Sequence, residues 1–167
     1  MLLYLIDLKT FTLSKSETSE LLEKMKLTWP SDLVPKVKSL KVFELEEGKR
    51  LLAADNAVVA VQIDSDMLLP FLGARKDILE HFPSVTVDMG AVKFVCNGAN
   101  ITRPGITHFE SFKKGDIVLV KDETHGKVLA VGQAIEDSET VKAMSKGYIV
   151  ENLHYISDKV WEYSKEI

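Results

Sequence analysis

The chain has 167 residues, 46% hydrophobic and 28% charged, a composition that excludes a disordered or fibrous protein. Its formal net charge is −4, and each half is slightly acidic, with 11 Lys and Arg against 13 Asp and Glu before Ser84 and 10 against 12 from Ser84 onward. This balance argues against a protein that coats nucleic acid through bulk positive charge, so any RNA site must combine a local basic patch with shape recognition.

The start of the chain predicts a strand followed by a helix. The apolar segment Met1–Asp7 is too short to span a membrane and lacks the basic leader of a signal peptide, so we expect a first strand there. Ser14 and Glu17 have the spacing of a capping box and predict a helix from Ser16 to about Lys26. No other segment approaches the length of a transmembrane helix, so we expect no membrane association.

The rest of the first half predicts strands and then a second helix. Val37–Leu45 and Arg50–Ala54 are expected strands, and Asp55–Asn56 is an expected turn. Ala57–Ile63 is rich in β-branched residues and predicts a further strand. Apolar spacing over Asp66–Phe82 predicts a helical segment.

The second half predicts short strands separated by glycine turns, the pattern of a small barrel. Asp88 is predicted to cap a helix from Met89 to Asn97, which Gly98 ends. We expect the domain junction near Pro83–Ser84 and, because each half is only marginally large enough to fold alone, we expect the halves to pack on each other. The remaining expected elements are strands at Val85–Val87, Ala99–Ile101, Asp116–Val120, Val128–Ala134, Tyr148–Val150 and Leu153–Ile156, a turn at Arg103–Gly105 and a short helix at Ser138–Met144.

Two segments resemble known families. Asp88–Ile106 is similar to the signature of a PUA domain, with an Asp-x-Gly-Ala helix start, a Gly-Ala pair and a Pro-Gly-Ile turn, and Lys113–Val118 resembles that family's Gly-Asp-x-Val strand. The tail Ser145–Trp161 resembles the malignant T-cell-amplified-sequence family through Lys-Gly, Glu-Asn-x-His-Tyr and Asp-x-x-Trp. The resemblance implies an α/β (α+β) fold, with an N-terminal mixed pre-PUA domain over residues 1–83 and a C-terminal PUA pseudo-barrel over residues 84–167.

The resemblance also implies a function. Eukaryotic relatives, including ligatin, act at the small ribosomal subunit with tRNA, together with density-regulated protein or a fused equivalent. We therefore expect a cytoplasmic RNA-binding protein associated with translation, which contacts tRNA or ribosomal RNA through its PUA domain and has the small ribosomal subunit or a translation factor as a further partner. Two alternatives stay open, a protein-interaction adaptor without RNA binding, which the acidic balance favours, and an accessory subunit of an RNA-modification enzyme.

The resemblance places the RNA face at the loop between the helix after Asp88 and the next strand. Lysine and arginine supply phosphate contacts, asparagine can bond a base edge or ribose hydroxyl, and a tyrosine ring can stack on an exposed base. Structural roles stay open beside these, namely turn geometry for the glycines, a hydrogen bond for His154 and core packing for Tyr155. The expected RNA-binding residues are Lys93, Asn97, Gly98, Ala99, Asn100, Thr102, Arg103, Lys146, His154 and Tyr155.

Catalysis finds little support in the sequence. The single cysteine, Cys96, lies in an apolar helical pattern that predicts a buried and inert thiol, and it excludes an internal disulfide. The four histidines lack the spacing of metal ligands, and neither a phosphate-binding loop nor a nucleophile elbow is present. We therefore expect neither an enzyme nor a cofactor, and the lone cysteine fits a reducing cytoplasm.

Overall fold

The structure, a computed structural model, describes residues 9–167, so the predicted strand at Met1–Asp7 lies outside the described residues. Its strands form two sheets. The first contains β1 (Lys9–Thr12), β2 (Lys41–Glu44), β3 (Arg50–Ala54), β4 (Ala57–Gln62) and β5 (Leu68–Pro70). The second contains β6 (Ser84–Val87), β7 (Ile101–Thr102), β8 (Ile106–Phe109), β9 (Ile117–Asp122), β10 (Val128–Ala134) and β11 (Tyr148–Tyr155).

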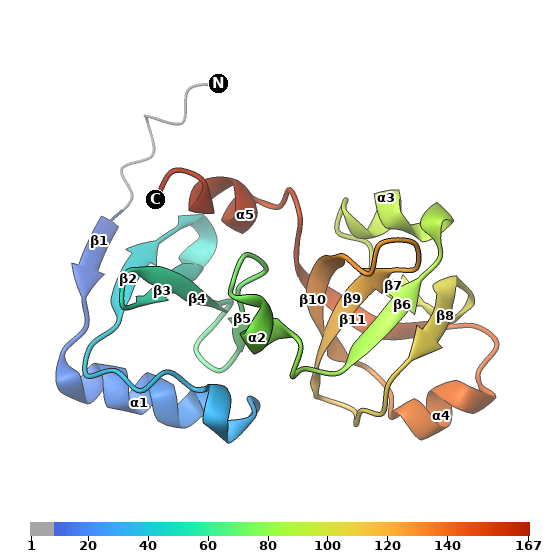
Figure 1. The fold of residues 1–167 in the computed structure, drawn as a ribbon, viewed down its shortest axis with the longest axis horizontal. Helices are drawn as coiled ribbons and strands as arrows, with labels where there is room; N and C mark the ends of the chain where they lie inside the picture. The colour runs from blue at the N-terminus through green and yellow to red at the C-terminus, as the bar shows by residue number, and fades with distance from the viewer. Residues whose placement is uncertain (1–8) are drawn as a thin grey trace.

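Short helices flank the sheets, and the predicted α+β class is confirmed. The helices are α1 (Lys15–Met25), α2 (Lys76–Leu79), α3 (Val92–Val95), α4 (Ser138–Ala143) and α5 (Lys159–Ser164), with 3-10 turns η2 (Ser31–Leu33), η3 (Glu46–Gly48), η4 (Met89–Ala91) and η5 (Arg103–Gly105). The two sheets lie side by side along the long axis of the molecule (Figure 1). The first sheet has the order β1-β2-β3-β4-β5, and the second, nearly a barrel, has the order β7-β11-β10-β9-β6-β8. No helix of residues 9–167 is long and apolar enough to cross a membrane.

Helix α1 starts at the predicted capping box. The Glu17 backbone N–H donates to Ser14 Oγ at 3.0 Å, and the Ser14 backbone N–H donates to Glu17 Oε1 at 3.2 Å. Each end of the helix lies one residue earlier than predicted. Leu21 and Met25 are buried on one face of the helix, against the first sheet, and the polar face is exposed.

The tight turn between β3 and β4 is also confirmed. Asp55 and Asn56 have φ values of 50° and 68°, the left-handed conformation that a two-residue hairpin of this type requires. Asp and Asn tolerate this conformation better than most residues do.

The predicted strand Val37–Leu45 is shorter in the structure. Only Lys41–Glu44 form β2, because the partner strand β1 ends at Thr12, which pairs with Lys41. Beyond Thr12 the chain turns into α1, and beyond Ala54 the other neighbour, β3, enters its hairpin turn, so residues before Lys41 lie past the paired residues of both neighbouring strands.

The predicted helix over Asp66–Phe82 is wrong. Leu68–Pro70 form the edge strand β5, and Lys76–Leu79 form only the short helix α2. Pairing with β4 buries Leu68 and Leu69, and an edge strand tolerates the missing N–H of Pro70. The apolar spacing of this segment fits a helix as well as a strand, and pairing with β4 selects the strand.

The second sheet confirms several predicted elements and changes others. Asp88 caps the predicted helix by accepting a hydrogen bond from the Ala91 N–H at 2.9 Å, but the helix is split into η4 and the single turn α3. The two predicted final strands form one strand, β11, and the sequence did not predict β8 or α5. Both omissions are short segments with a weak local pattern.

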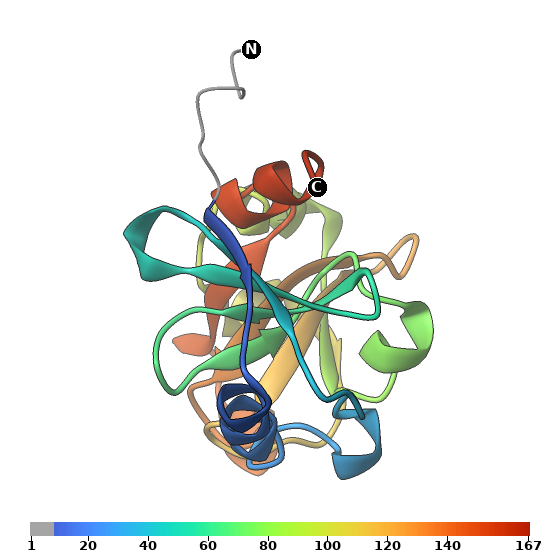
Figure 2. The ribbon, with the colours of Figure 1, turned by 90° about the vertical axis from the view of Figure 1, so that its left-hand side faces the viewer.

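The first lobe, built on the sheet β1–β5, and the second lobe, built on the sheet β6–β11, pack on each other as expected. One continuous core contains Trp29 and Leu68 from the first lobe together with Ile117 and Leu119 from the second. The end of the chain also crosses the junction, since Val160 of α5 packs against β3 and β4 of the first sheet. Figure 2 shows α1 and α5 on opposite sides of that sheet. The division into residues 1–83 and 84–167 stays a prediction.

A buried histidine connects the two lobes. His154 is completely buried, and its Nε2 accepts a hydrogen bond from the Leu72 backbone N–H at 3.2 Å. Because Nε2 accepts, the ring proton lies on Nδ1, which donates to Asp158 Oδ2 at 2.7 Å. The Phe71 ring stacks on the imidazole with 5.7 Å between centroids.

We expect His154→Ala to lower the free energy of unfolding by about 3 kcal/mol, because it leaves the Leu72 N–H unpaired and opens a cavity between the lobes. Urea denaturation followed by tryptophan fluorescence measures the change. His108 is exposed on β8 and provides a control, for which His108→Ala should change stability by no more than about 0.5 kcal/mol. Equal effects of the two substitutions would contradict the bridging role of His154.

Candidate nucleic-acid interface

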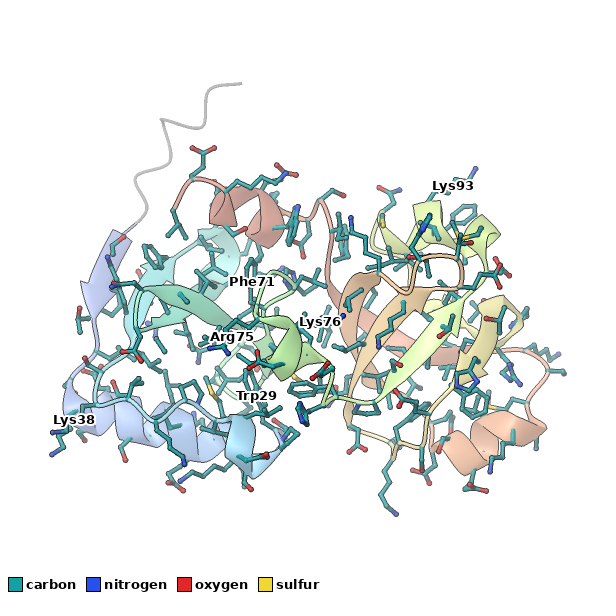
Figure 3. The ribbon with its side chains drawn as sticks, viewed as in Figure 1. Trp29, Lys38, Phe71, Arg75, Lys76 and Lys93 are labelled. Atoms are coloured by element: carbon teal, nitrogen blue, oxygen red, sulfur yellow. The ribbon has the colours of Figure 1, made fainter. Side chains whose placement is uncertain are left out.

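The predicted loop after α3 lies on the surface of the second lobe. Lys93, Asn97, Ala99, Asn100 and Thr102 are all exposed. Figure 3 shows Lys93 at the outer edge of the second lobe, pointing away from the first lobe. The structure thus brings most of the predicted RNA-binding residues to one accessible region.

A cleft of about 290 Å³ opens between α3 and β7. Val87, Val95 and Ile101 contribute to its apolar lining, and Asn100 and Thr102 supply polar groups. Apolar walls with a few polar groups are typical of a pocket that accepts a flat, partly polar ligand group. A nucleobase has this chemistry.

The exposed ring of Phe94 lines this cleft, and the sequence did not identify it as a site residue. Its side chain is 57% exposed, with Lys93 Nζ 5.2 Å from the ring centroid. The sequence predicts a helix from Met89 to Asn97, whereas α3 has only one turn and leaves the Phe94 ring exposed. An exposed aromatic ring beside a lysine combines a stacking surface with a phosphate contact.

Gly98 brings the loop against Tyr155. Its φ of +93° is accessible to glycine, and a Cβ at this position would lie 3.1 Å from the Tyr155 ring and hydroxyl. Tyr155 is half-buried, and its ring supports the loop at Gly98. The structural and functional interpretations of this tyrosine are compatible.

Asn152, part of the Glu-Asn-x-His-Tyr motif but not among the expected site residues, holds the same loop. Its Nδ2 donates to the carbonyl oxygens of Val95 and Ala99, both at 3.0 Å. Its backbone N–H donates to Asn100 Oδ1 at 2.9 Å, which fixes the side chain of Asn100 at the cleft. The loop is therefore held in a defined conformation by β11.

Arg103 points inward. Its Nε donates to the Val141 carbonyl at 2.9 Å, and the guanidinium carbon lies 5.5 Å from the centroid of the Phe109 ring. These contacts give the half-buried Arg103 a structural task, connecting η5 to α4 and β8. We therefore leave it out of the proposed RNA contacts.

Lys146 lies in the exposed turn before β11. Tyr148 follows at the start of that strand, pairs with Thr102 of β7 and is 60% exposed. Tyr148 is not among the residues expected from the sequence, because an aromatic residue in a strand is usually buried. Lys146 and Tyr148 extend the region of lysine and aromatic side chains past Thr102.

His154 does not belong to this surface, because its side chain is completely buried between the lobes. Burial alone would raise the pKa of its partner Asp158. Hydrogen bonds from His154 and from the Trp161 and Tyr155 backbone N–H groups outweigh burial and hold that pKa below its ordinary value. His154 and Asp158 thus form a structural pair.

Similarity to known proteins shows the family of this chain. The PUA domain model matches residues 83–156, which include every predicted RNA-binding residue. The chain is 33% identical to translation machinery-associated protein 20 of Saccharomyces cerevisiae, over 81% of this chain and 78% of that protein, and 29% identical to human malignant T-cell-amplified sequence 2, over 93% and 89%. This chain belongs to the family of translation machinery-associated protein 20, whose members carry a PUA domain, and it is similar to the malignant T-cell-amplified sequences.

A solved structure shares the fold of the whole described chain. A hypothetical protein from Pyrococcus horikoshii has a TM-score of 0.78 and 27% identity, covering 93% of this chain and 99% of that one. The similarity therefore includes both lobes as well as the PUA match.

Reactive groups near the interface are few. Burial raises the pKa of the Cys96 thiol, which keeps it protonated at neutral pH and therefore weakly nucleophilic. Within residues 9–167, no group of three or more His, Cys, Asp or Glu side chains could hold a metal ion.

We expect Gly98→Ala to destabilise the protein by about 2 kcal/mol more than Gly126→Ala does. Both glycines have positive φ, but a Cβ at Gly126 would meet no atom within 4 Å, whereas at Gly98 it would press on Tyr155. Thermal or urea denaturation of the two variants measures the difference. Equal losses would show that Tyr155 moves aside freely.

The lowered pKa of Asp158 predicts a pH dependence. In the unfolded chain this carboxyl has a pKa of about 3.9, so its stabilising effect is present above that pH and is lost as the pH falls through the lower folded value. Asp158→Asn should therefore be less stable than the wild type at neutral pH, with a difference that shrinks below about pH 4. Urea denaturation over a pH series measures it, and a constant difference would contradict the assignment.

Proposed function

We propose that this chain is a cytoplasmic RNA-binding protein of the translation machinery. It contacts tRNA or ribosomal RNA through the surface formed by α3, β7 and the loop between them, which is the RNA face and is also called the α3–β7 face. The observation that carries the proposal is the apolar cleft, with the exposed Phe94 ring and Lys93 at its edge, inside the segment that matches the PUA domain. The name of the yeast relative, translation machinery-associated protein 20, supports the link to translation.

The side chains of the face have distinct proposed roles. Lys93 and Lys146 contact phosphates, and they position the RNA without reading its sequence. A base unstacked from a loop or a chain end enters the cleft and stacks on Phe94, with a second base on Tyr148. Asn97, Asn100 and Thr102 supply hydrogen bonds to base edges or ribose hydroxyls.

The proposed role is non-catalytic, and it needs no cofactor. The face offers a preorganised binding surface, and burial raises the pKa of the neighbouring Cys96 thiol, which further lowers its reactivity. The small ribosomal subunit or a translation factor is the proposed further partner. An adaptor without RNA binding is the outcome that the following experiment would distinguish.

We expect Lys93→Glu combined with Lys146→Glu to weaken tRNA binding at least about ten-fold and to reduce the slope of log K against log salt by about one per lysine. Filter binding at several salt concentrations measures both quantities. Lys113→Glu with Lys114→Glu makes the same change in net charge at two exposed residues before β9 and is the matched control. Equal losses in both variants would show that only overall charge matters.

Phe94→Ala should cost about 1–3 kcal/mol of binding free energy if a base stacks on this ring, whereas Phe94→Tyr should retain most of the affinity. If tRNA and ribosomal RNA fragments fail to bind the wild type, the adaptor alternative is favoured.

A further inference from the structure

A second cleft lies in the first lobe, between α1 and the segment of residues 34–38. Its volume is about 420 Å³. Residues of α1 form one wall, and the irregular segment that follows η2 forms the other. Figure 3 places Lys38, which lines this cleft, at the opposite end of the molecule from Lys93 on the RNA face.

The edges of this cleft are basic. Lys15 and Lys26 contribute from α1, and Lys36 and Lys38 contribute from the opposite wall. Glu23 also lines the cleft and pairs with Lys26 at 2.8 Å. Lys15, Lys36 and Lys38 make no ion pair among the residues that the structure describes, so positive charge stays unbalanced here, in a half of the chain with more acidic than basic residues.

The floor of the cleft is apolar. Leu22 of α1 and Val37 are partly buried and pack against the main core, whereas Val34 belongs to that core and Pro35 is half-exposed. Lysines above an apolar floor would complement a ligand that carries both carboxylates and aliphatic side chains.

The backbone of the outer wall has unused hydrogen-bonding groups. Residues 35–38 belong to no helix or strand, and within residues 9–167 their backbone groups make no hydrogen bond. An extended peptide can bond such groups through its own backbone, as in strand addition. Phosphate groups offer acceptors only and so would leave the backbone carbonyls of residues 36–38 unpaired. The described residues that line the cleft include no aromatic ring or arginine on which a base could stack.

We propose that the cleft between α1 and residues 34–38 binds an extended acidic segment of a protein partner. Alternate side chains of the segment insert into the apolar floor, and the carboxylates between them pair with Lys15, Lys36 and Lys38. The peptide backbone bonds residues 36–38. This surface is separate from the RNA face, so a partner segment and an RNA can be bound together.

The probe is a pool of acetylated heptapeptides in which Asp or Glu alternates with Leu, Ile, Val or Phe. Titration into the isotope-labelled, full-length chain, followed by amide NMR shifts, is expected to perturb residues 36–38 and the exposed face of α1. Lys36→Glu with Lys38→Glu should weaken binding at least about ten-fold. Lys93→Glu with Lys146→Glu changes the net charge equally on the RNA face and should leave peptide binding unchanged. Because all four lysines are exposed, both variants should fold.

Two further pools separate the contributions. Replacing the acids with lysine should abolish binding, and N-methylation of alternate peptide amides should weaken it by removing backbone donors. The proposal is overturned if no shifts occur at millimolar peptide, if the shifts lie elsewhere, or if both charge-reversed variants lose affinity equally. It is also overturned if a uridine oligonucleotide shifts the same amides and displaces the peptides, since the cleft would then be a nucleic-acid surface. Failure of tRNA binding alone, with peptide binding intact, would refute only the RNA face.

Discussion

Strand β11 is held on both sides, and this double pairing is the constraint on which the rest of the second lobe depends. It pairs with β10 on one side and with β7 on the other. Gly132 of β10 permits the close approach, since a Cβ there would collide with the Glu151 carbonyl oxygen. From this one strand Asn152 holds the loop of the RNA face, and His154 bonds the first lobe. The binding surface and the junction between lobes therefore share a single backbone support.

The elements that could be predicted from the sequence are those in which a side chain acts on its own backbone. Ser14 and Asp88 cap the turns that follow them, and Asp55 and Asn56 adopt the conformation their hairpin needs. The segment Asp66–Phe82 was predicted wrongly because its apolar spacing fits a helix as well as a buried strand. Pairing with β4 favours the strand over the helix, and the local sequence of this segment does not show that β4 will lie beside it.

The candidate site shows the same division. The signature located the loop, and its lysine and two asparagines are exposed as the resemblance implied. Phe94 and Tyr148 were missed, because aromatic rings predict burial unless the surrounding structure is known. Arg103 and His154 have the chemistry of RNA contacts, yet they bond Val141 and Leu72, which are distant in sequence. Residue type indicates what a side chain can bind, whereas tertiary packing determines what it does bind.

The acidic overall charge of the chain limits how these two surfaces can attract their ligands. With a net charge of −4 and few lysines on the α3–β7 face, long-range attraction to RNA is weak, so affinity must come from short-range stacking and fit. The cleft between α1 and residues 34–38 lies at the far end of the molecule from the RNA face. Because a continuous core joins the two lobes, packing holds the relative positions of these two surfaces. Two modest surfaces in a fixed arrangement favour an assembly in which RNA and a protein segment are present together, because the second contact forms at high effective concentration. Selectivity for such a composite target does not require strong binding to either component alone.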